Sequence, residues 1–459
     1  MCLSEPQAGS SLSDIVTRAV PDGDSPLGPR YRLFGNKMWI SAGDHELGEN
    51  IVHLVLAKIP GPDGKLVPGV KGISLFVVPK FLVDVQGQGA DARVSLGERN
   101  DVVVAGLNHK LGWRGTVNTL LNFGEGRHRP DGAAGAVGYR VGEPGRGLAA
   151  MFTMMNEARI GVGLSAAVLG MAGYRHALDY ACSRPQGRPL TGEGKDAASP
   201  QVPIIEHADV RRMLLAQKAY AEGAFALNLY CARLVDEQRT APEDTQRREA
   251  GLLLDILTPI AKSWPSQWCL EANSLAIQVL GGYGYTRDYP VEQYWRDNRL
   301  NMIHEGTHGI QAVDLLGRKV LMEDGAALRL LGQRMQATIV RAAASANPDT
   351  RRWAGMLAQR VQRVAEVTQA AWAGGEPKLA LANATPYLEA FGHVVLAWIW
   401  LDLSLAASAH YRDGDSDFYH GVWLACRYFH LYELPRVDAQ LDLVASRDDT
   451  TLAAQEGWF

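Results

Sequence analysis

The sequence lacks the cysteine patterns typical of a disulfide framework or a zinc site. Its 459 residues contain five cysteines, an odd number, and no CxxC pair or Cys/His cluster occurs. Isolated cysteines of this kind are typical of small buried hydrophobic side chains in a reducing compartment. They are Cys2, Cys182, Cys231, Cys269 and Cys426.

A large net charge and a long hydrophobic run are also missing. Lys and Arg number 46 against 50 Asp and Glu, which gives a formal net charge of −4 and predicts no binding to nucleic acid. The longest apolar run, residues 394–401, is too short to span a bilayer. Neither a basic nor an apolar leader segment follows Met1. We therefore expect a cytoplasmic protein without membrane insertion.

Several catalytic motifs are absent as well. No GxSxG nucleophile elbow and no P-loop occur, so nothing favours a hydrolase or a nucleoside triphosphatase. The 12 histidines show no HExxH spacing, and His304 and His308 share only an i,i+4 relation. The sequence therefore predicts no metal site.

The first 140 residues carry the pattern of an antiparallel β domain. Residues 31–40 predict a hairpin with its turn at Gly35 and Asn36. Short runs rich in Val, Ile, Leu and Phe follow at even spacing, without helical patterns between them, which favours a sandwich or barrel. The runs are residues 51–59, 72–79, 102–107, 116–123 and 136–141.

The pattern changes to helical after the glycine-rich stretch 142–147, because apolar residues then recur at three- and four-residue spacings. Pro259 is compatible with the first turn of a separate helix. The expected helices are residues 148–184, 204–238, 242–257, 259–280, 307–322, 326–346, 350–373, 376–410 and 417–432. We expect an α+β chain with three domains: β domain 1–141, helical bundle 142–325 and C-terminal helical domain 326–459.

Two short stretches could carry chemistry. Glu305 follows an apolar stretch and precedes Gly306 and Thr307, so it could be a general base with a raised pKa or a carboxylate that satisfies amides at a helix start. Gly281, Gly282 and Gly284 could admit a pyrophosphate, but they follow a predicted helix, which favours an ordinary helix C-cap.

Taken together, three strings resemble the flavin-dependent acyl-CoA dehydrogenase family. Residues 1–10, MCLSEPQAGS, are similar to the family's TEPxAGSD segment, and residues 37–41, KMWIS, to its KxWIT/S segment. The third string runs from QVLGGYGY at 278–285 through YPVE and RD to EGT at 305–307. Residues 184–188, 382–389 and 425–435 resemble a longer branch that contains 3-methylmercaptopropionyl-CoA dehydrogenase-like enzymes and carries an extra C-terminal helical domain.

The resemblance implies FAD-dependent dehydrogenation of an acyl-CoA thioester to the 2-enoyl-CoA. Glu305 would remove the α-proton while a hydride passes to flavin N5, and the Gly306 amide would bind the thioester carbonyl. The implied cofactor residues are Leu3, Ser4, Trp39, Ser41, Arg184, Gln278, Gly282 and Thr307. The implied substrate residues are Ser10, Asn156, Arg159 and His304.

The resemblance also implies a homo-oligomer that passes electrons to an electron-transfer flavoprotein or a similar acceptor. Departures at Asn156, His207, His304 and Gly309 predict an altered pocket. The N-terminal helical domain of the family is expected to be missing before Met1. The alternative is therefore a non-enzymatic or split flavin-binding subunit, inactive without a separate N-terminal helical domain.

Overall fold

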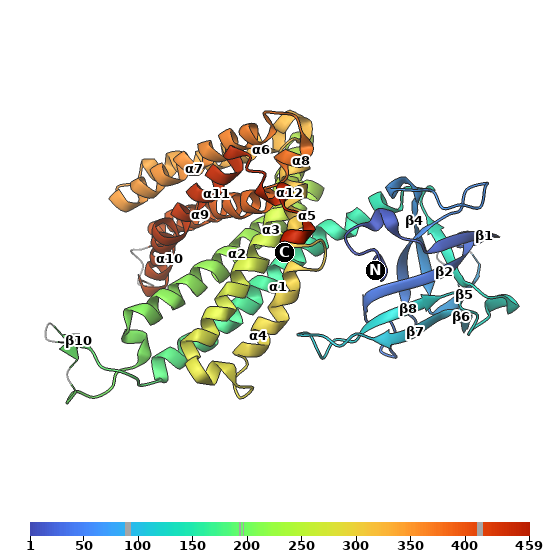
Figure 1. Ribbon diagram of the computed structural model, residues 1–459, viewed down its shortest axis with the longest axis horizontal. Coiled ribbons are helices and arrows are strands. Elements are labelled where there is room, and N and C mark those ends of the chain that lie inside the picture. The colour runs from blue at the N-terminus through green and yellow to red at the C-terminus, as the bar shows by residue number, and fades with distance from the viewer. Residues whose placement is uncertain (88–92, 192–193, 196, 411–415) are drawn as a thin grey trace. The chain divides into compact units, whose positions relative to one another are not determined.

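A computed structural model describes residues 1–87, 93–191, 194–195, 197–410 and 416–459. It contains two compact units, Met1–Glu157 and Ala158–Phe459 (Figure 1). The first is built on β-strands and the second on helices, so the predicted α+β fold class is confirmed. The division into three domains stays a prediction.

The strands of the β unit form a sheet in the order β1-β3-β4-β9-β2-β8-β7. Because β1 also pairs with β2, part of this sheet closes on itself as a barrel. Strands β5 and β6 form a separate antiparallel pair. The strands are β1 (Arg18–Ser25), β2 (Gly28–Ser41), β3 (Val52–Lys58), β4 (Ile73–Pro79), β5 (Phe81–Gln86), β6 (Arg93–Arg99), β7 (Val102–Leu107), β8 (Asn118–Phe123) and β9 (Ala136–Val141).

The predicted hairpin at residues 31–40 is wrong. Strand β2 runs unbroken through Gly35 and Asn36, which pair with Phe123 and Asn122 of β8, and the turn lies before β2 instead. Gly35 serves close packing here, because a Cβ at this position would lie 2.4 Å from the hydroxyl oxygen of Thr17. The glycine therefore signals a close backbone approach within a strand.

Apolar side chains that alternate along the strands fill the barrel interior. Leu33 of β2, Val55 of β3 and Phe76 of β4 are fully buried in one cluster. A second cluster joins Leu75 of β4 to Met151, so the first turns of the following helix pack within the β unit.

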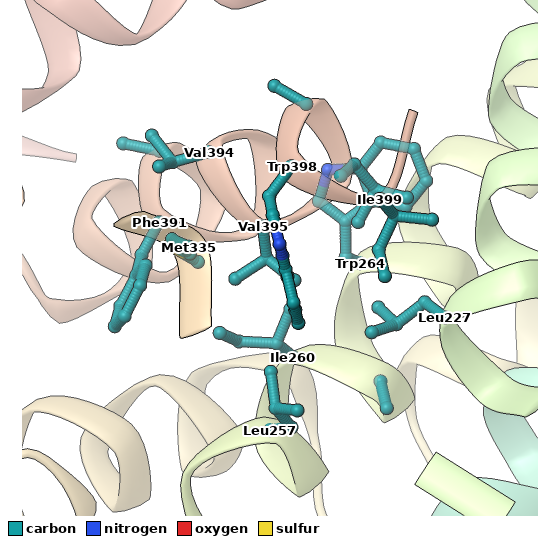
Figure 2. Packing of buried hydrophobic residues seen from close by; sticks show 14 of the residues in the cluster. Leu227, Leu257, Ile260, Trp264, Met335, Phe391, Val394, Val395, Trp398 and Ile399 are labelled. Carbon is teal, nitrogen blue, oxygen red and sulfur yellow. The ribbon is translucent and has the colours of Figure 1, made fainter. Parts of the chain in front are cut away.

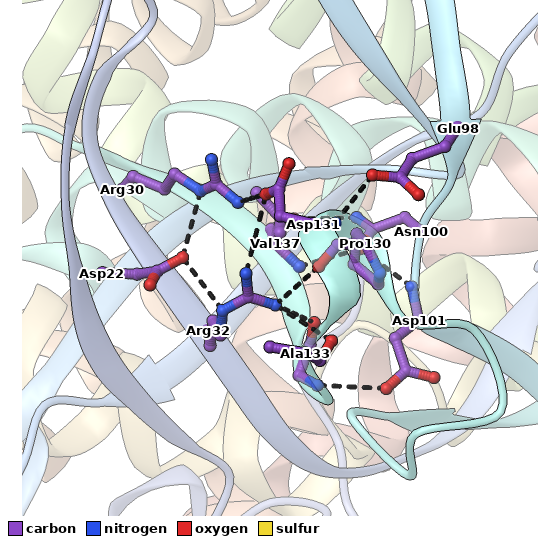
Figure 3. Close-up of polar contacts among 11 residues, drawn as sticks. Asp22, Arg30, Arg32, Glu98, Asn100, Asp101, Pro130, Asp131, Ala133 and Val137 are labelled. Carbon is purple, nitrogen blue, oxygen red and sulfur yellow. Dashed lines mark hydrogen bonds and ion pairs between the residues drawn. The ribbon is translucent and has the colours of Figure 1, made fainter.

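Figure 3 shows a cluster of polar and charged side chains in the β unit. Asp22 forms ion pairs with the Nε atoms of Arg30 and Arg32 at 3.1 and 3.0 Å. Deeper in the unit, buried Asn100 donates to the carbonyls of Pro79 and Val137 at 2.8 Å and accepts from the Val137 amide at 2.8 Å. Asn100 therefore satisfies backbone groups that the sheet leaves unpaired.

Long helices make up the second unit, together with a short pair of strands, β10 (Leu190–Thr191) and β11 (Gly194–Lys195). The π-helical turns Leu315–Lys319 and Phe429–Glu433 extend two of the helices. The helices are α1 (Gly147–Ser183), which begins in the β unit, α2 (Ala208–Thr240), α3 (Asp244–Leu280), α4 (Val291–Asn298), α5 (His308–Asp314), α6 (Met322–Ala343), α7 (Pro348–Trp372), α8 (Pro377–Ala380), α9 (Ala384–His410), α10 (Ser416–Tyr428), α11 (Val437–Ser446) and α12 (Thr450–Ala453).

Helix α3 is one helix where the sequence predicted two. Pro259 and Pro265 both lie inside it, and each removes a backbone hydrogen bond, at a cost of about 3 kcal/mol in an isolated helix. Residues 256–266 are buried without a break, so packing offsets that loss. The helix ends at Gly281, which has φ +60 and donates to the Gln278 carbonyl, as the C-cap prediction expected.

The core of the helical unit lies between α9 and the helices α2, α3 and α6. Figure 2 shows Val395 and Trp398 of α9 near Ile260 of α3, with Leu227 and Met335 close by. The stretch Ala384–Ser408 of α9 is long and apolar enough to cross a membrane, yet 78% of its most apolar window is buried inside the unit. Its hydrophobicity is therefore explained by its place in the core.

We expect Asn100→Ala to lower the free energy of unfolding by about 2 kcal/mol, because buried backbone groups lose their partners. Denaturant titration followed by circular dichroism measures the change. Asn36→Ala is the control, since the exposed Asn36 side chain donates to Asn122 at the surface, at 2.6 Å. An equal loss in both variants would contradict this role of Asn100.

Candidate active site

A buried ion pair between Lys37 and Glu5 joins the predicted flavin-binding segment at the N-terminus to the barrel. Lys37 of β2 donates to Glu5 at 2.9 Å and to the carbonyl of Leu3 at 3.0 Å, and both charged side chains are almost completely buried. Burial raises the pKa of Glu5, but the Lys37 charge and hydrogen bonds from Thr17 and Val16 outweigh it, so the pKa is lowered. This arrangement fixes the backbone of the first residues.

The neighbouring part of β2 presents the other predicted flavin residues. The β2–β8 register shifts between Lys37 and Ile40, and within this bulge Trp39 takes φ +66 and is 59% exposed. The amide of Met38, beside Trp39, donates to the Ser4 carbonyl at 3.0 Å. The structure therefore brings Leu3, Ser4 and Trp39 to one part of the barrel.

Ser41 ends strand β2 with an exposed side chain. Its hydroxyl accepts from Asn118 at 3.2 Å, which leaves the hydroxyl proton free for donation to another group. Ser10 is exposed, and Asn156 is half-buried on the part of α1 that belongs to the β unit. No contact in the described residues assigns a role to Ser10 or Asn156.

In the helical unit, the predicted catalytic residues form a strained turn. Glu305 has φ +53, which is unusual for a residue with a side chain, and Gly306 has φ +91. Gln311 of α5 donates to the Glu305 carbonyl at 3.0 Å, and Lys262 of α3 donates to the Gly306 carbonyl at 2.7 Å. Two buried side chains from two helices therefore hold this backbone.

The Glu305 carboxylate is not used as a helix cap. Thr307 caps α5, since its hydroxyl accepts from the Ile310 amide at 3.4 Å. No hydrogen bond to the carboxylate of Glu305 occurs within the part of the chain that the structure describes. This geometry favours a general base over a residue that satisfies amides at a helix start.

Burial controls the charges around this turn. Desolvation raises the pKa of Glu305, against the opposing charges of Arg159 and Lys262. Desolvation, together with the charge of Arg159, lowers the pKa of Lys262 to about 7. Desolvation and the Lys262 charge lower the pKa values of His304 and His308 to about 4, so both imidazoles are neutral at physiological pH.

Arg159 lies at the start of the helical unit, where the resemblance places it. Its guanidinium is buried and forms an ion pair with Asp314 of α5 at 3.4 Å. Asp314 also accepts from Arg318 one turn further on, at 2.7 Å. The structure therefore brings Arg159 into the same charge cluster as Glu305.

His304 ends a chain of buried amides that sequence reasoning missed. It bonds to Asn301 at 3.0 Å, Asn301 donates to Asn298 at 2.9 Å, and Asn298 donates to Asn273 at 2.7 Å. Asn273 in turn donates to the Leu169 carbonyl at 2.9 Å. This network links the catalytic turn to α3 and α1.

Lys262 and Gln311 were also missed, for a physical reason. Lys262 acts on backbone 44 residues away and Gln311 on backbone six residues away. A Lys or Gln within a helical pattern normally indicates a solvated position. Lys262 follows five apolar or hydroxyl residues, and that is the single signal in the sequence that could have marked it. For Gln311 we find no signal.

Three predicted cofactor residues lie at the far end of α3. Arg184 lies over the ring of Tyr283 at 5.7 Å, next to the exposed residues Gln278 and Gly282. Sixteen residues of helix separate Lys262 from Gln278, or about 24 Å. The structure therefore groups Arg184, Gln278 and Gly282 apart from the Glu305 turn.

Two residues at positions of departure have simple surroundings. His207, at the N-cap of α2, bonds to the Gln186 carbonyl at 2.7 Å. Gly309 is exposed, with open space where a side chain would begin. Among the described residues, no group of His, Cys, Asp and Glu could hold a metal ion.

Two family models match the helical unit. The one described as "Acyl-CoA dehydrogenase, C-terminal domain" matches residues 195–321, and the one described as "Acetyl-CoA dehydrogenase C-terminal like" matches residues 331–455. A relative from Ruegeria pomeroyi, 3-methylmercaptopropionyl-CoA dehydrogenase, is 37% identical over 466 residues, which are 99% of this chain and 72% of the relative. The chain belongs to the acyl-CoA dehydrogenase family.

Other comparisons agree with this family. The broad-specificity linear acyl-CoA dehydrogenase FadE5 of Mycobacterium tuberculosis is 34% identical over 475 residues, covering 100% of this chain and 74% of that protein. This acyl-CoA dehydrogenase is thus an oxidoreductase of a family whose cofactor is FAD. The expected lack of an N-terminal helical domain is not tested by these matches and stays a prediction.

Solved structures share the fold of this acyl-CoA dehydrogenase. ACDH-11 of Caenorhabditis elegans, solved with C11-CoA, matches with a TM-score of 0.72 at 20% identity and covers 99% of this chain and 68% of that one. An acyl-CoA dehydrogenase of Bacillus anthracis, solved with FAD, matches with a TM-score of 0.71 at 18% identity, covering 96% and 68%.

We expect Lys37→Met to destabilise the β unit by about 3–5 kcal/mol, because Glu5 is left as an unpaired buried charge. The measurement is denaturant unfolding of the purified protein, together with its content of bound FAD. Adding Glu5→Gln to Lys37→Met should recover part of the loss. The exposed pair Arg233–Glu237 provides a control, and Arg233→Ala should cost less than about 1 kcal/mol.

The pH profile of kcat/KM should have an acid limb above pH 4.5, because the ionised form of Glu305 is the base and its pKa is raised above that ordinary value. Lys262→Met removes a positive charge that lowers this pKa, so the limb should move to higher pH. Initial rates between pH 4.5 and 8 measure the acid limb in the wild type and in Lys262→Met. A limb that stays unchanged in Lys262→Met would contradict the assignment.

Proposed function

We propose that the chain catalyses the FAD-dependent α,β-dehydrogenation of an acyl-CoA thioester to the 2-enoyl-CoA, with Glu305 as the base. The observation that carries this proposal is the Glu305–Gly306 turn. It offers a partly buried carboxylate with a raised pKa beside a backbone amide. A base and an amide donor are the two groups that removal of a proton next to a thioester carbonyl requires.

The residues of the β unit fit the cofactor of the family. An exposed indole on a strand bulge, Trp39, offers an apolar face to a flat ring system. Ser41 has a hydroxyl proton to donate, and the backbone of Leu3 and Ser4 is held in place by Lys37 and Met38. When bound, FAD supplies the acceptor for the hydride that leaves the β-carbon.

Glu305 takes the α-proton on its carboxylate. Because desolvation raises its pKa, the carboxylate is a stronger base than an exposed glutamate, and the positive charges of Arg159 and Lys262 oppose this rise. Neutral His304 lies next to it in the sequence and adds no competing positive charge.

The Gly306 amide binds the thioester oxygen, where negative charge develops as the α-proton leaves. Among the described residues, nothing accepts a hydrogen bond from this N–H. An amide donor that is already oriented needs no reorganisation during the reaction, which is the main source of such stabilisation.

Assembly, acceptor and location form the finer part of the proposal. Helix α3 spans about 24 Å between Lys262 and Gln278, so Arg184, Gln278 and Gly282 lie far from the Glu305 turn of their own chain. This separation supports a homo-oligomer in which these three residues contact the cofactor of a neighbouring subunit. We propose an electron-transfer flavoprotein or a similar acceptor, and a cytoplasmic location. Linear and sulfur-containing acyl-CoAs, the substrates named for the two relatives, form the first panel to test.

Glu305→Gln should lower the rate constant of flavin reduction by acyl-CoA at least about a hundredfold, because the amide cannot take the proton. Anaerobic stopped-flow mixing, followed at the flavin absorbance band, measures this rate. Glu323→Gln is the control, since Glu323 pairs with Arg248 at the surface.

Equal bleaching in the wild type and in Glu305→Gln would overturn the assignment of the base. If the wild-type protein holds FAD but no acyl-CoA of the panel bleaches the flavin, the result would favour the non-enzymatic or split subunit. Recovery of bleaching on addition of a separate helical protein would identify the split form.

A further inference from the structure

A cavity of about 720 Å³ lies between helices α6, α7 and α9 of the helical unit. Helices α6 and α7 are joined by a short connection, run antiparallel and lie side by side (Figure 1). Cavities of this volume are in the range that holds small molecules. Neither Glu305 nor Lys262 is among the residues that line it, so the cavity is distinct from the candidate active site.

Apolar side chains form most of its wall. Phe391 and Val394 of α9 line the inner side and are almost completely buried, and Figure 2 shows them beside Met335 of α6. Along α7 the lining extends from residue 361 to residue 372, a distance of about 16 Å. The shape and the chemistry of this wall suit an alkyl chain. Further apolar lining comes from Leu328, Leu331, Val361, Val364 and Trp372.

Three exposed polar side chains lie at one end of the cavity. Asp324 and Arg329 belong to the first turns of α6, and Gln369 belongs to the last turn of α7. Arg329 donates to the backbone carbonyl of Asp324, which keeps the guanidinium beside that residue. Within the part of the chain that the structure describes, no ion pair joins the two side chains. This end therefore offers one positive and one negative charge.

A left-handed turn places Asp324 at the cavity. Glu323, Asp324 and Gly325 have φ +48, +54 and +83 in succession, before the regular part of α6 begins. Glu323 forms an ion pair with Arg248 of α3, so the turn is held from both sides. The position of the Asp324 carboxylate is thus fixed by the backbone.

We propose that this cavity binds a single-chain amphiphile with a zwitterionic head group. The alkyl chain lies along the apolar wall, where its removal from water drives binding. Arg329 pairs with the anionic group of the head, and Asp324 pairs with its cationic group. A fatty acid offers only the anion, which Asp324 repels. The proposal does not depend on the dehydrogenation, so either can fail without the other.

Gly332 of α6 provides a way to close the cavity without unfolding the helix. It lines the cavity, and a Cβ there would meet no atom within 4 Å. Its backbone is helical, and leucine is a better helix former than glycine. Gly355→Leu is the matched control, since Gly355 is an exposed helical glycine of α7 with the same open space and does not line the cavity.

The test is isothermal titration calorimetry of the FAD-loaded protein with dodecylphosphocholine below its micelle concentration. We expect one molecule to bind per chain, with the negative heat-capacity change that marks apolar burial. The affinity should rise about fourfold for each methylene group added between the octyl and the dodecyl chain. Gly332→Leu should weaken binding at least about tenfold, because it fills the space of several methylene groups, and Gly355→Leu should leave it unchanged.

Two charge variants test the head group. Arg329→Gln and Asp324→Asn should each weaken the binding of dodecylphosphocholine about two- to fivefold, as expected for exposed ion pairs. Dodecanoate, which carries the anion alone, should bind the wild type more weakly than dodecylphosphocholine does. For dodecanoate, Asp324→Asn should strengthen binding, because a repelling charge is removed.

Dodecylphosphocholine binding that persists in Gly332→Leu, or an equal loss in Gly355→Leu, would overturn the proposal. Absence of binding to the wild type would do the same, as would tighter binding of dodecanoate than of dodecylphosphocholine. A wild-type dimer that Gly332→Leu converts to monomers, without any binding of dodecylphosphocholine, would assign the cavity to a contact between copies of the chain and contradict the proposal. None of these outcomes depends on flavin reduction.

Discussion

A left-handed backbone at Glu305, followed by a second positive φ at Gly306, is the constraint on which the candidate chemistry depends. For a residue with a side chain this conformation costs about 1–3 kcal/mol and persists only where the surroundings enforce it. Lys262 and Gln311 supply that enforcement from two helices. The turn leaves the carboxylate and the Gly306 amide available because the two carbonyls are occupied elsewhere.

The β unit also uses a buried lysine that donates to a backbone carbonyl. Lys37 is buried in strand β2 and donates to the Leu3 carbonyl at 3.0 Å, as Lys262 does to the Gly306 carbonyl at 2.7 Å. In both places a lysine on a regular element fixes an irregular segment that carries predicted functional residues. Burying an ammonium costs free energy, which indicates that the position of each segment is under tight constraint. The difference lies in the partners, because Lys37 has the carboxylate of Glu5 within 2.9 Å.

Local patterns predicted most of the regular structure. The strands 102–107 and 136–141 and the helix that ends near residue 184 match the observed bounds closely, because alternation and helical periodicity reflect burial directly. The predicted hairpin at Gly35 and the predicted helix break before Pro259 are wrong for the same reason. Each relied on a residue that usually ends an element, and tertiary packing around Thr17 and along α3 overrode that local preference.

The candidate site was predictable only in part. Motif resemblance predicted Glu305, Gly306 and Arg159, and the structure places the charge of Arg159 close enough to lower the pKa of Glu305 against desolvation. Lys262 contacts backbone 44 residues away, and Asn298 contacts Asn273 25 residues away, which no local pattern records. Gln311 contacts Glu305 only six residues away, but nothing in the sequence marks its side chain as buried.

Exchange of the substrate α-proton with solvent tests the central claim most directly. An acyl-CoA analogue that carries no hydrogen at the β-carbon can lose only its α-proton, so hydride transfer does not interfere. In deuterated water, the account predicts that the wild type incorporates deuterium at the α-carbon, seen by mass spectrometry, and that Glu305→Gln does not. Equal incorporation by both proteins, or none above the uncatalysed rate with the wild type, would contradict it.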